Sequence, residues 1–272
     1  MKRILSAVVF LPAFWVIVRL APPPVYHFLI AAAAGLAILE LFRLAEARGH
    51  RCHRPVAVLV AFLLMAAFLT PRVRIEHALA IALFALPVAS LVRGGDWGRA
   101  FGDIGSSFFI AVFIGLLFGY MVGLREVADA IQGRELGADL VFLLVLVVWG
   151  SDTAAYYTGR LLGRRPLAPS VSPKKTVEGA FGGIAGALAA AFLARAWFMH
   201  RLTPVDCLLL GAGLGVIGMV GDLVESMFKR GAGQKDSAAL VPGHGGILDR
   251  VDSLLYAAPA LYYYYLFGMG AR

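Results

Sequence analysis

Residues 221–252 read GDLVESMFKRGAGQKDSAALVPGHGGILDRVD and differ sharply from the sequence on either side of them. The segment contains five acidic residues, four basic residues and one His. Residues 211–220 before it carry no charge, and neither do residues 253–271 after it. Charged side chains are costly beside apolar segments that are suited to lipid. We therefore expect this segment to join two membrane-spanning helices and to carry the chemistry of the protein.

The composition of the whole chain is that of an integral membrane protein. Of its 272 residues, 60% are hydrophobic and only 15% are charged, whereas a soluble domain carries roughly 25% charge. A helix that crosses a membrane needs about 20 mostly apolar residues. The pattern predicts an all-α, polytopic protein with about nine transmembrane helices, near residues 4–20, 25–42, 55–70, 75–92, 106–124, 138–158, 179–198, 204–224 and 251–268. Cys52 and Cys207 form neither a disulfide framework nor a metal-ligand spacing.

The distribution of Lys and Arg predicts the orientation. With nine spans, one side of the membrane holds 17 of these residues and the other holds 8. The richer side should be cytoplasmic, so the protein is expected in a bacterial-type inner membrane with its polar segments facing the cytoplasm. The net charge of +8 then reflects basic loops beside anionic lipid headgroups, and no nucleic-acid partner is expected.

A second polar segment, WGSDTAAYYTGRLLGRRPLAPSVSPKKTVEG, covers residues 149–179. Asp152 follows an uncharged run, so it should face water or the protein interior; the alternative is a cap on a helix end at Gly150. Lys174 and Lys175 are either topology anchors or phosphate contacts. A helix that starts near Thr176 would offer free N–H groups to an anion.

Other features of the helices leave their roles open. In residues 179–186, glycines spaced four apart permit close helix packing, either within one chain or between two copies. Glu40, near the end of its span, is expected to be a solvated carboxylate at the membrane interface. We divide the chain into an N-terminal scaffold, residues 1–135 with spans 1–5, and a catalytic region, residues 136–272 with spans 6–9.

The spacing of the polar residues resembles that of a known family. Ser226, Lys229-Arg230, Lys235-Asp236, Pro242, His244-Gly245-Gly246, Asp249-Arg250 and Asp252 stand in one window of 27 residues. This pattern resembles the signature of the phosphatidate cytidylyltransferases, which make CDP-diacylglycerol from CTP and phosphatidic acid. Val241 departs from it mildly, because Ile, Leu or Phe is usual there. Residues 172–178 resemble the same family, whereas the N-terminal half offers no motif to match.

The resemblance implies a magnesium-dependent enzyme that transfers CMP. It places metal-binding aspartates at Asp222 and Asp249, which an antiparallel pair of spans would bring together; the alternative is that each pairs with a neighbouring Lys or Arg. Mg²⁺ prefers such hard oxygen ligands, and a second cation stays open. Lys235 is expected to complete the catalytic set. Candidate contacts to CTP, phosphatidic acid or the membrane lipid are Asp152, Lys174, Lys175, Glu178, Ser226, Lys229, Arg230, Asp236, His244, Arg250 and Asp252.

Two rival functions and the oligomeric state stay open at this point. A CTP-dependent lipid kinase of the dolichol-kinase type would share the membrane, Mg²⁺ and CTP but not the full spacing. A transporter would place its polar residues at the membrane midplane and in repeated halves, whereas here they gather at one face and the sequence shows no internal repeat. A homodimer is neither indicated nor excluded by the sequence.

Overall fold

The computed structural model describes residues 14–127, 135–234 and 246–269, and these residues are mostly helical. The helices are α2 (Pro23–Glu46), α3 (Arg54–Ala66), α4 (Ile75–Arg93), α5 (Trp97–Glu126), α6 (Glu135–Leu162), α7 (Val177–Trp197), α8 (Pro204–Gly231) and α9 (Leu248–Tyr264), with a π-helix, η1 (Tyr265–Met269), at the end of α9. Each predicted span from 25–42 onward coincides with one of these helices. The first predicted span lies mostly outside the described residues.

Six of the helices are long and apolar enough to cross a membrane, namely α2, α4, α5, α6, α7 and α8. This confirms an α-helical, polytopic membrane protein. At 1.5 Å per residue, α3 with 13 residues is about 20 Å long, which is shorter than the hydrocarbon core of about 30 Å. The number nine therefore stays a prediction.

Local sequence explains where several helices begin. Proline stands at the start of α2, α3 and α8, where its missing N–H costs no hydrogen bond. Thr203 and Asp206 add a capping box to α8, in which each side chain accepts the other residue's backbone N–H. Inside the membrane such helices are favoured because they satisfy their own backbone groups.

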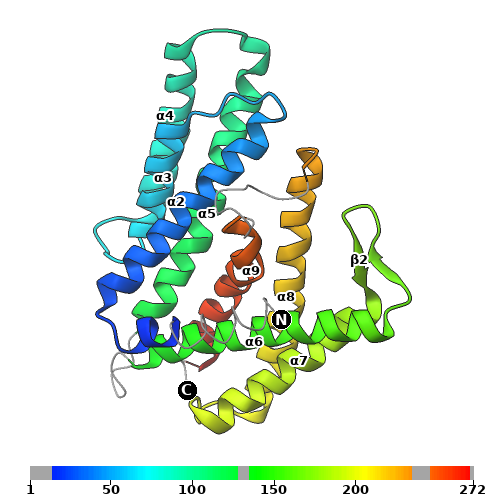
Figure 1. Ribbon diagram of the computed structural model, residues 1–272. Helices are drawn as coiled ribbons and strands as arrows, with labels where there is room; N and C mark the ends of the chain where they lie inside the picture. Colours follow the sequence, from blue (N-terminus) through cyan, green and yellow to red (C-terminus); the bar gives the residue numbers. More distant parts are fainter. Residues whose placement is uncertain (1–13, 128–134, 235–245, 270–272) are drawn as a thin grey trace.

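The helices form three groups (Figure 1). Helices α2 to α5 run alongside one another, with α3 and α2 packed on α5. Helices α6 and α7 pack along each other and lie across the direction of that first group. Helices α8 and α9 form the third group, in which α9 lies between α5 and α8 and contacts both. The polar segments therefore meet where all three groups adjoin.

The contact between α6 and α7 depends on the glycines of α7. A Cβ at Gly182 would lie 2.3 Å from the Thr158 side chain, and one at Gly186 would lie 2.4 Å from the Ala154 Cβ. Both distances are far below a normal contact, so only glycine permits the approach at these positions. Gly182 and Gly186 therefore pack against α6 of the same chain. Of the two alternatives for these glycines, packing within one chain and packing between two copies, the structure shows the first.

A short hairpin between α6 and α7 was not predicted. Strands β1 (Pro166–Ala168) and β2 (Ser172–Thr176) pair antiparallel, with Pro166 opposite Thr176. The hairpin projects from the α6–α7 pair beside α8 (Figure 1). It carries Lys174 and Lys175, so these lysines lie on an ordered strand that a purely helical prediction omits.

Candidate active site

The register of α8 against α9 decides which acidic residues meet. A Cβ at Gly221 would lie 2.9 Å from the backbone oxygen of Asp252, and Lys229 forms an ion pair with Asp249. The two helices are therefore antiparallel, with the C-terminal part of α8 beside the N-terminal part of α9. Asp222 comes level with Asp252, and Glu225 comes level with Asp249.

One group of charges, the Lys175 cluster, consists of Lys175, Asp152, Asp222 and Asp252. Lys175 Nζ lies 2.6 Å from Asp222 Oδ2, so the hairpin reaches across to α8. Asp222 also interacts electrostatically with Asp152 on α6 and with Asp252 on α9. Asp252 is buried, and its Oδ1 accepts the Ser253 N–H at 2.6 Å. Three carboxyl groups from three helices thus lie near one ammonium group, and Asp222 is in contact with it.

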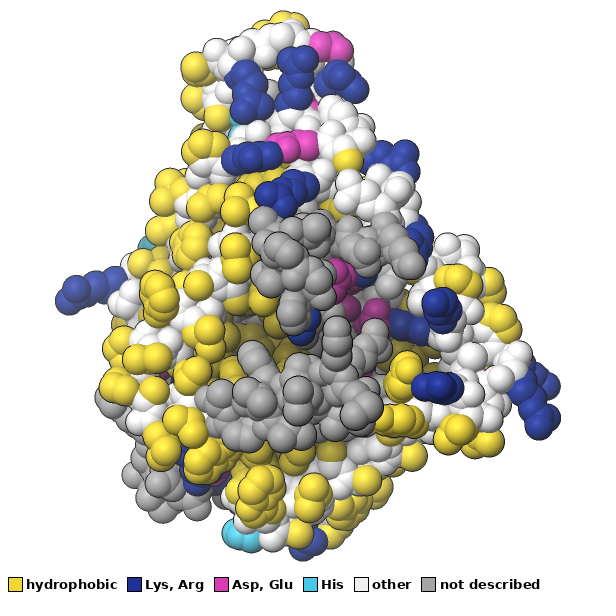
Figure 2. All heavy atoms as spheres, in the orientation of Figure 1, with side chains coloured by type: hydrophobic (Ala, Val, Ile, Leu, Met, Phe, Trp, Pro, Cys, Tyr) yellow, Lys and Arg dark blue, Asp and Glu magenta, His cyan; other side chains and the backbone are white. Residues whose placement is uncertain are grey.

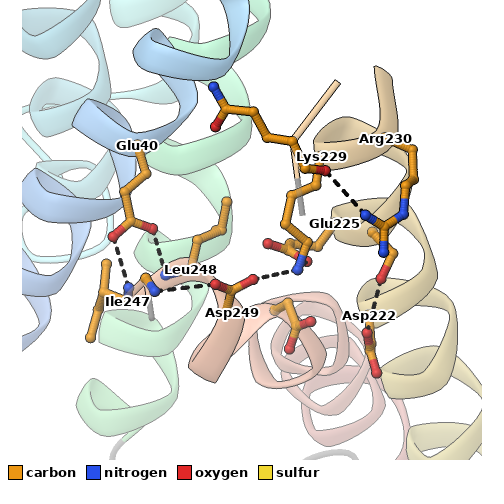
Figure 3. Close-up of polar contacts among 12 residues, drawn as sticks. Glu40, Asp222, Glu225, Lys229, Arg230, Ile247, Leu248 and Asp249 are labelled. Carbon is orange, nitrogen blue, oxygen red and sulfur yellow. Dashed lines mark hydrogen bonds and ion pairs between the residues drawn. The ribbon is translucent and has the colours of Figure 1, made fainter. Parts of the chain in front are cut away.

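A second group, the Lys229 cluster, consists of Lys229, Glu225 and Asp249 (Figure 3). Lys229 Nζ lies 2.5 Å from Glu225 Oε2 and also forms a close ion pair with Asp249 Oδ1. Asp249 Oδ2 accepts the Gly246 N–H at 3.1 Å. Burial of these charges is tolerated because each has an opposite partner.

Several predicted substrate contacts hold the hairpin and its surroundings in place. Arg230 Nε donates to the Val171 oxygen at 3.2 Å, which ties the hairpin to the end of α8. Glu178 Oε2 accepts the backbone N–H groups of Arg164 and Arg165 at 3.0 and 3.2 Å. These contacts give Arg230 and Glu178 structural partners, whatever they do with substrate.

Three further predicted contacts lie at the edge of the Lys175 cluster or on the surface. Ser226 is buried, and its hydroxyl donates to Asp222 Oδ1 at 3.4 Å, which is a long contact. Lys174 and Arg250 are exposed. Ser226 therefore lies beside the Lys175 cluster through its contact with Asp222. The Lys174 side chain lies on the surface.

The start of α7 differs in one respect from the expectation. The helix begins at Val177, as predicted, but its first N–H groups are not all free. Thr176 Oγ1 accepts the Gly179 N–H at 3.1 Å, and the Arg165 oxygen accepts the Val177 N–H at 2.9 Å. Two of the four N–H groups that an anion could use are thus satisfied by the protein itself.

The structure corrects one alternative for Asp152 and the expectation for Glu40. Helix α6 continues through Gly150, so the alternative that Asp152 caps a helix end there is wrong. Glu40 is fully buried rather than solvated, and its carboxylate accepts two backbone N–H groups at the start of α9. The sequence reasoning missed Glu40 because nothing near it in the chain indicates a partner 207 residues away.

The remaining predicted residues, Lys235, Asp236 and His244, lie outside the described residues, and the expectations for them stand as predictions. Figure 2 shows acidic side chains near the centre of one face, with Lys and Arg side chains beside them. A cavity of about 10 Å³, lined by Glu225 and Asp252 on its polar side and by Phe113 and Phe228, has room for about one water molecule. This cavity is too small to hold a nucleotide.

The donor set is suited to a divalent cation. Five carboxyl groups in the two clusters lie near two ammonium groups, so oxygen ligands outnumber the cationic side chains. The oxygens of Glu225 are buried, and the contact of Oε2 with Lys229 is an ion pair without hydrogen-bond geometry. Among those residues no group of three or more side chains is already arranged to hold a metal ion. Mg²⁺ commonly takes one or two carboxylates and completes its ligands with water and substrate phosphates, and this site offers that chemistry.

Comparison with known proteins identifies the family of the chain. The model of the cytidylyltransferase family matches residues 1–267. The chain is 35% identical over 270 residues to a phosphatidate cytidylyltransferase of Bacillus subtilis, covering 96% of this chain and 94% of the relative. It is 36% identical over 271 residues to one of Pseudomonas aeruginosa, covering 95% and 94%. One of Haemophilus influenzae is 44% identical over 135 residues, covering 48% and 47%. The chain therefore belongs to the cytidylyltransferase family, as the spacing of its polar residues predicted, and is a nucleotidyltransferase.

Proposed function

We propose that the protein transfers CMP from CTP to phosphatidic acid and releases CDP-diacylglycerol and pyrophosphate, in a Mg²⁺-dependent step of phospholipid synthesis. The proposal rests on acidic groups from α6, α8 and α9 that lie near two lysines where these helices adjoin. It is supported by relatives of nearly the same length that are named phosphatidate cytidylyltransferase. The cytoplasmic face of a bacterial inner membrane is the proposed location, because that side carries the excess of Lys and Arg.

The bonds exchanged in this reaction set what the site must do. A phosphate oxygen of phosphatidic acid bonds to the α-phosphorus of CTP, and the bond from that phosphorus to the bridging oxygen of pyrophosphate breaks. A phosphomonoester has a second pKa of about 6 and is largely dianionic at neutral pH, so the attack requires no general base. The difficulty is electrostatic, because two polyanions must approach each other.

The residues of this chain divide the electrostatic work. Asp222 and Asp249 are the proposed ligands of Mg²⁺, which when bound neutralises charge on the phosphates. Lys175 and Lys229 hold these two carboxylates in defined positions through the ion pairs. Exposed Lys174, on the same strand as Lys175, is placed to attract an incoming phosphate. Lys235 and His244 are proposed to contact the nucleotide on the basis of the family pattern alone.

The test uses purified protein in detergent micelles with phosphatidic acid and CTP labelled in its cytidine. We expect the label to move into a lipid-soluble product only when Mg²⁺ is present, with pyrophosphate released in equal amount. A lipid kinase would instead leave the label in water-soluble CDP. Failure of an active, folded preparation to label the lipid at any Mg²⁺ concentration would refute the proposal, and an Asp222→Asn preparation serves as the matched blank.

A further inference from the structure

Helix α9 begins without a cap of its own. Ile247 already has helical dihedral angles, with φ −69° and ψ −36°, and supplies no side-chain cap. Gly246 before it has no side chain, and its own N–H is taken by Asp249. The first N–H groups of a helix have no partners inside the helix. The start of α9 therefore depends on an acceptor from elsewhere.

Glu40 supplies that acceptor from α2 (Figure 3). Its Oε1 accepts the Ile247 N–H at 2.8 Å, and its Oε2 accepts the Leu248 N–H at 3.0 Å. The Glu40 side chain is fully buried. A buried carboxylate is stable only where hydrogen bonds or opposite charge replace water, and the positive end of a helix dipole adds to that stabilisation.

The same short turn holds Asp249. Leu248 donates its N–H to one oxygen of Glu40 and is followed directly by Asp249, whose Oδ2 accepts the Gly246 N–H. Any rotation of this turn would move the Asp249 carboxylate relative to Lys229. We propose that Glu40 is a positioning residue, which fixes the first turn of α9 so that Asp249 is held ready for its role in the reaction. This inference rests on the proposed function of Asp249.

A second contact from the N-terminal region supports the idea. The Arg48 guanidinium, in the loop after α2, donates to the backbone oxygen of Gly231, the last residue of α8. A cation at the end of one helix and an anion at the start of the next both match the helix dipoles. The N-terminal region thus forms hydrogen bonds with the backbone at the end of α8, through Arg48, and at the start of α9, through Glu40.

The test substitutes Glu40→Gln in the full-length protein. Gln keeps the shape but loses the charge, and its NH₂ group cannot accept a hydrogen bond. We expect amide hydrogen exchange in a peptide covering residues 246–250 to accelerate by about tenfold or more, since one or both N–H groups lose their acceptor. We expect kcat to fall about 10- to 100-fold, as for a small displacement of a reacting group, while KM for CTP stays near the wild-type value.

Two further variants make the test specific. Glu46→Gln is the matched control, because Glu46 lies on the same helix and pairs with Arg54 at the surface; it should change neither measurement. Glu40→Asp keeps the charge on a shorter side chain and should give intermediate values. It also tests the inference should Glu40→Gln fail to fold.

Each result bears on the proposal. Faster exchange at 246–250 together with a lower kcat supports it. Unchanged exchange, or faster exchange with unchanged kcat, overturns it, because Glu40 would then not act through α9 on Asp249. Should the wild-type protein make no CDP-lipid, the proposed function fails separately, and amide exchange alone decides whether Glu40 fixes the start of α9.

Discussion

Removing the Lys229 charge should be costly, because that ammonium group is the shared partner of two carboxylates. The Lys229 side chain is 12% exposed, and those of Glu225 and Asp249 are 4% and 20% exposed. Taking one partner from a buried ion pair costs about 3–5 kcal/mol. Asp249 keeps its bond from the Gly246 N–H and is the more exposed acid, so we expect Lys229→Met to cost about 3 kcal/mol, the lower end of that range.

Thermal unfolding in detergent, followed by intrinsic fluorescence, measures this effect. For a chain of this size, about 3 kcal/mol corresponds to a midpoint lowered by roughly 6–12 °C. Adding Glu225→Gln to Lys229→Met should recover much of the loss, because it removes the most deeply buried acid that the substitution leaves unpaired. A Lys229→Met midpoint within about 2 °C of wild type, less than 1 kcal/mol by the same scale, would refute the reasoning. So would a double variant less stable than the single one.

Three other measurements test separate parts of the structure and its function. Asp222→Asn and Asp249→Asn should each abolish formation of CDP-lipid, and chelation should stop the wild-type reaction until Mg²⁺ is restored; near-normal turnover by either variant at limiting Mg²⁺ removes that residue from the metal site. Gly182→Leu should destabilise the protein by about 1–3 kcal/mol or more through overpacking, since a Cβ there would lie 2.3 Å from a side-chain oxygen of α6, whereas Gly213→Leu, with nothing within 4 Å, should have little effect. Equal midpoints for these two variants would contradict the packing argument. Lys174→Cys should react with a membrane-impermeant maleimide only from the cytoplasmic side, and labelling from the other side would overturn the predicted orientation.

The sequence was sufficient for the class of protein and for the positions of most helices. Apolar runs of about 20 residues and prolines at helix starts mark α2 and α8 clearly. The polar segment around Asp222 and Asp249 was also recognisable, because charged residues between membrane-spanning segments are energetically costly and therefore indicate a functional site. These patterns depend only on residues that are close in sequence, so they can be recognised without the tertiary structure.

The pairing of the acids required the three-dimensional register. Asp222 and Asp249 were expected to meet, and in the structure Asp249 contacts Lys229, whereas Asp222 contacts Lys175 and lies near Asp152 and Asp252. An antiparallel pair brings together the residues nearest the connection and, separately, those further from it. Asp222 and Glu225 are three residues apart on α8, and Asp249 and Asp252 are three apart on α9. The antiparallel rule predicts their pairing only when the end of α8 and the start of α9 are both known.

Glu40 and the hairpin could not be found from the sequence for a different reason. The partners of Glu40 are backbone N–H groups, which carry no signature in the amino-acid sequence. Strand β1 has only three residues, too few to show alternation of apolar and polar side chains. Contacts to backbone and very short strands leave no periodic pattern, so they appear only in the folded chain.

The distribution of the site over α6, α8 and α9 has a consequence for biosynthesis. A chain that is still being inserted into the membrane presents Asp152, Lys175 and Asp222 before the residues of α9 have been translated. It lacks Asp249 and Asp252 until that helix is in place, and the buried Glu40 has no helix start to bind. On the proposed assignment of the site, we expect a partly synthesised protein to be inactive towards nucleotide and lipid, and activity to begin only when α9 has joined the helices made before it.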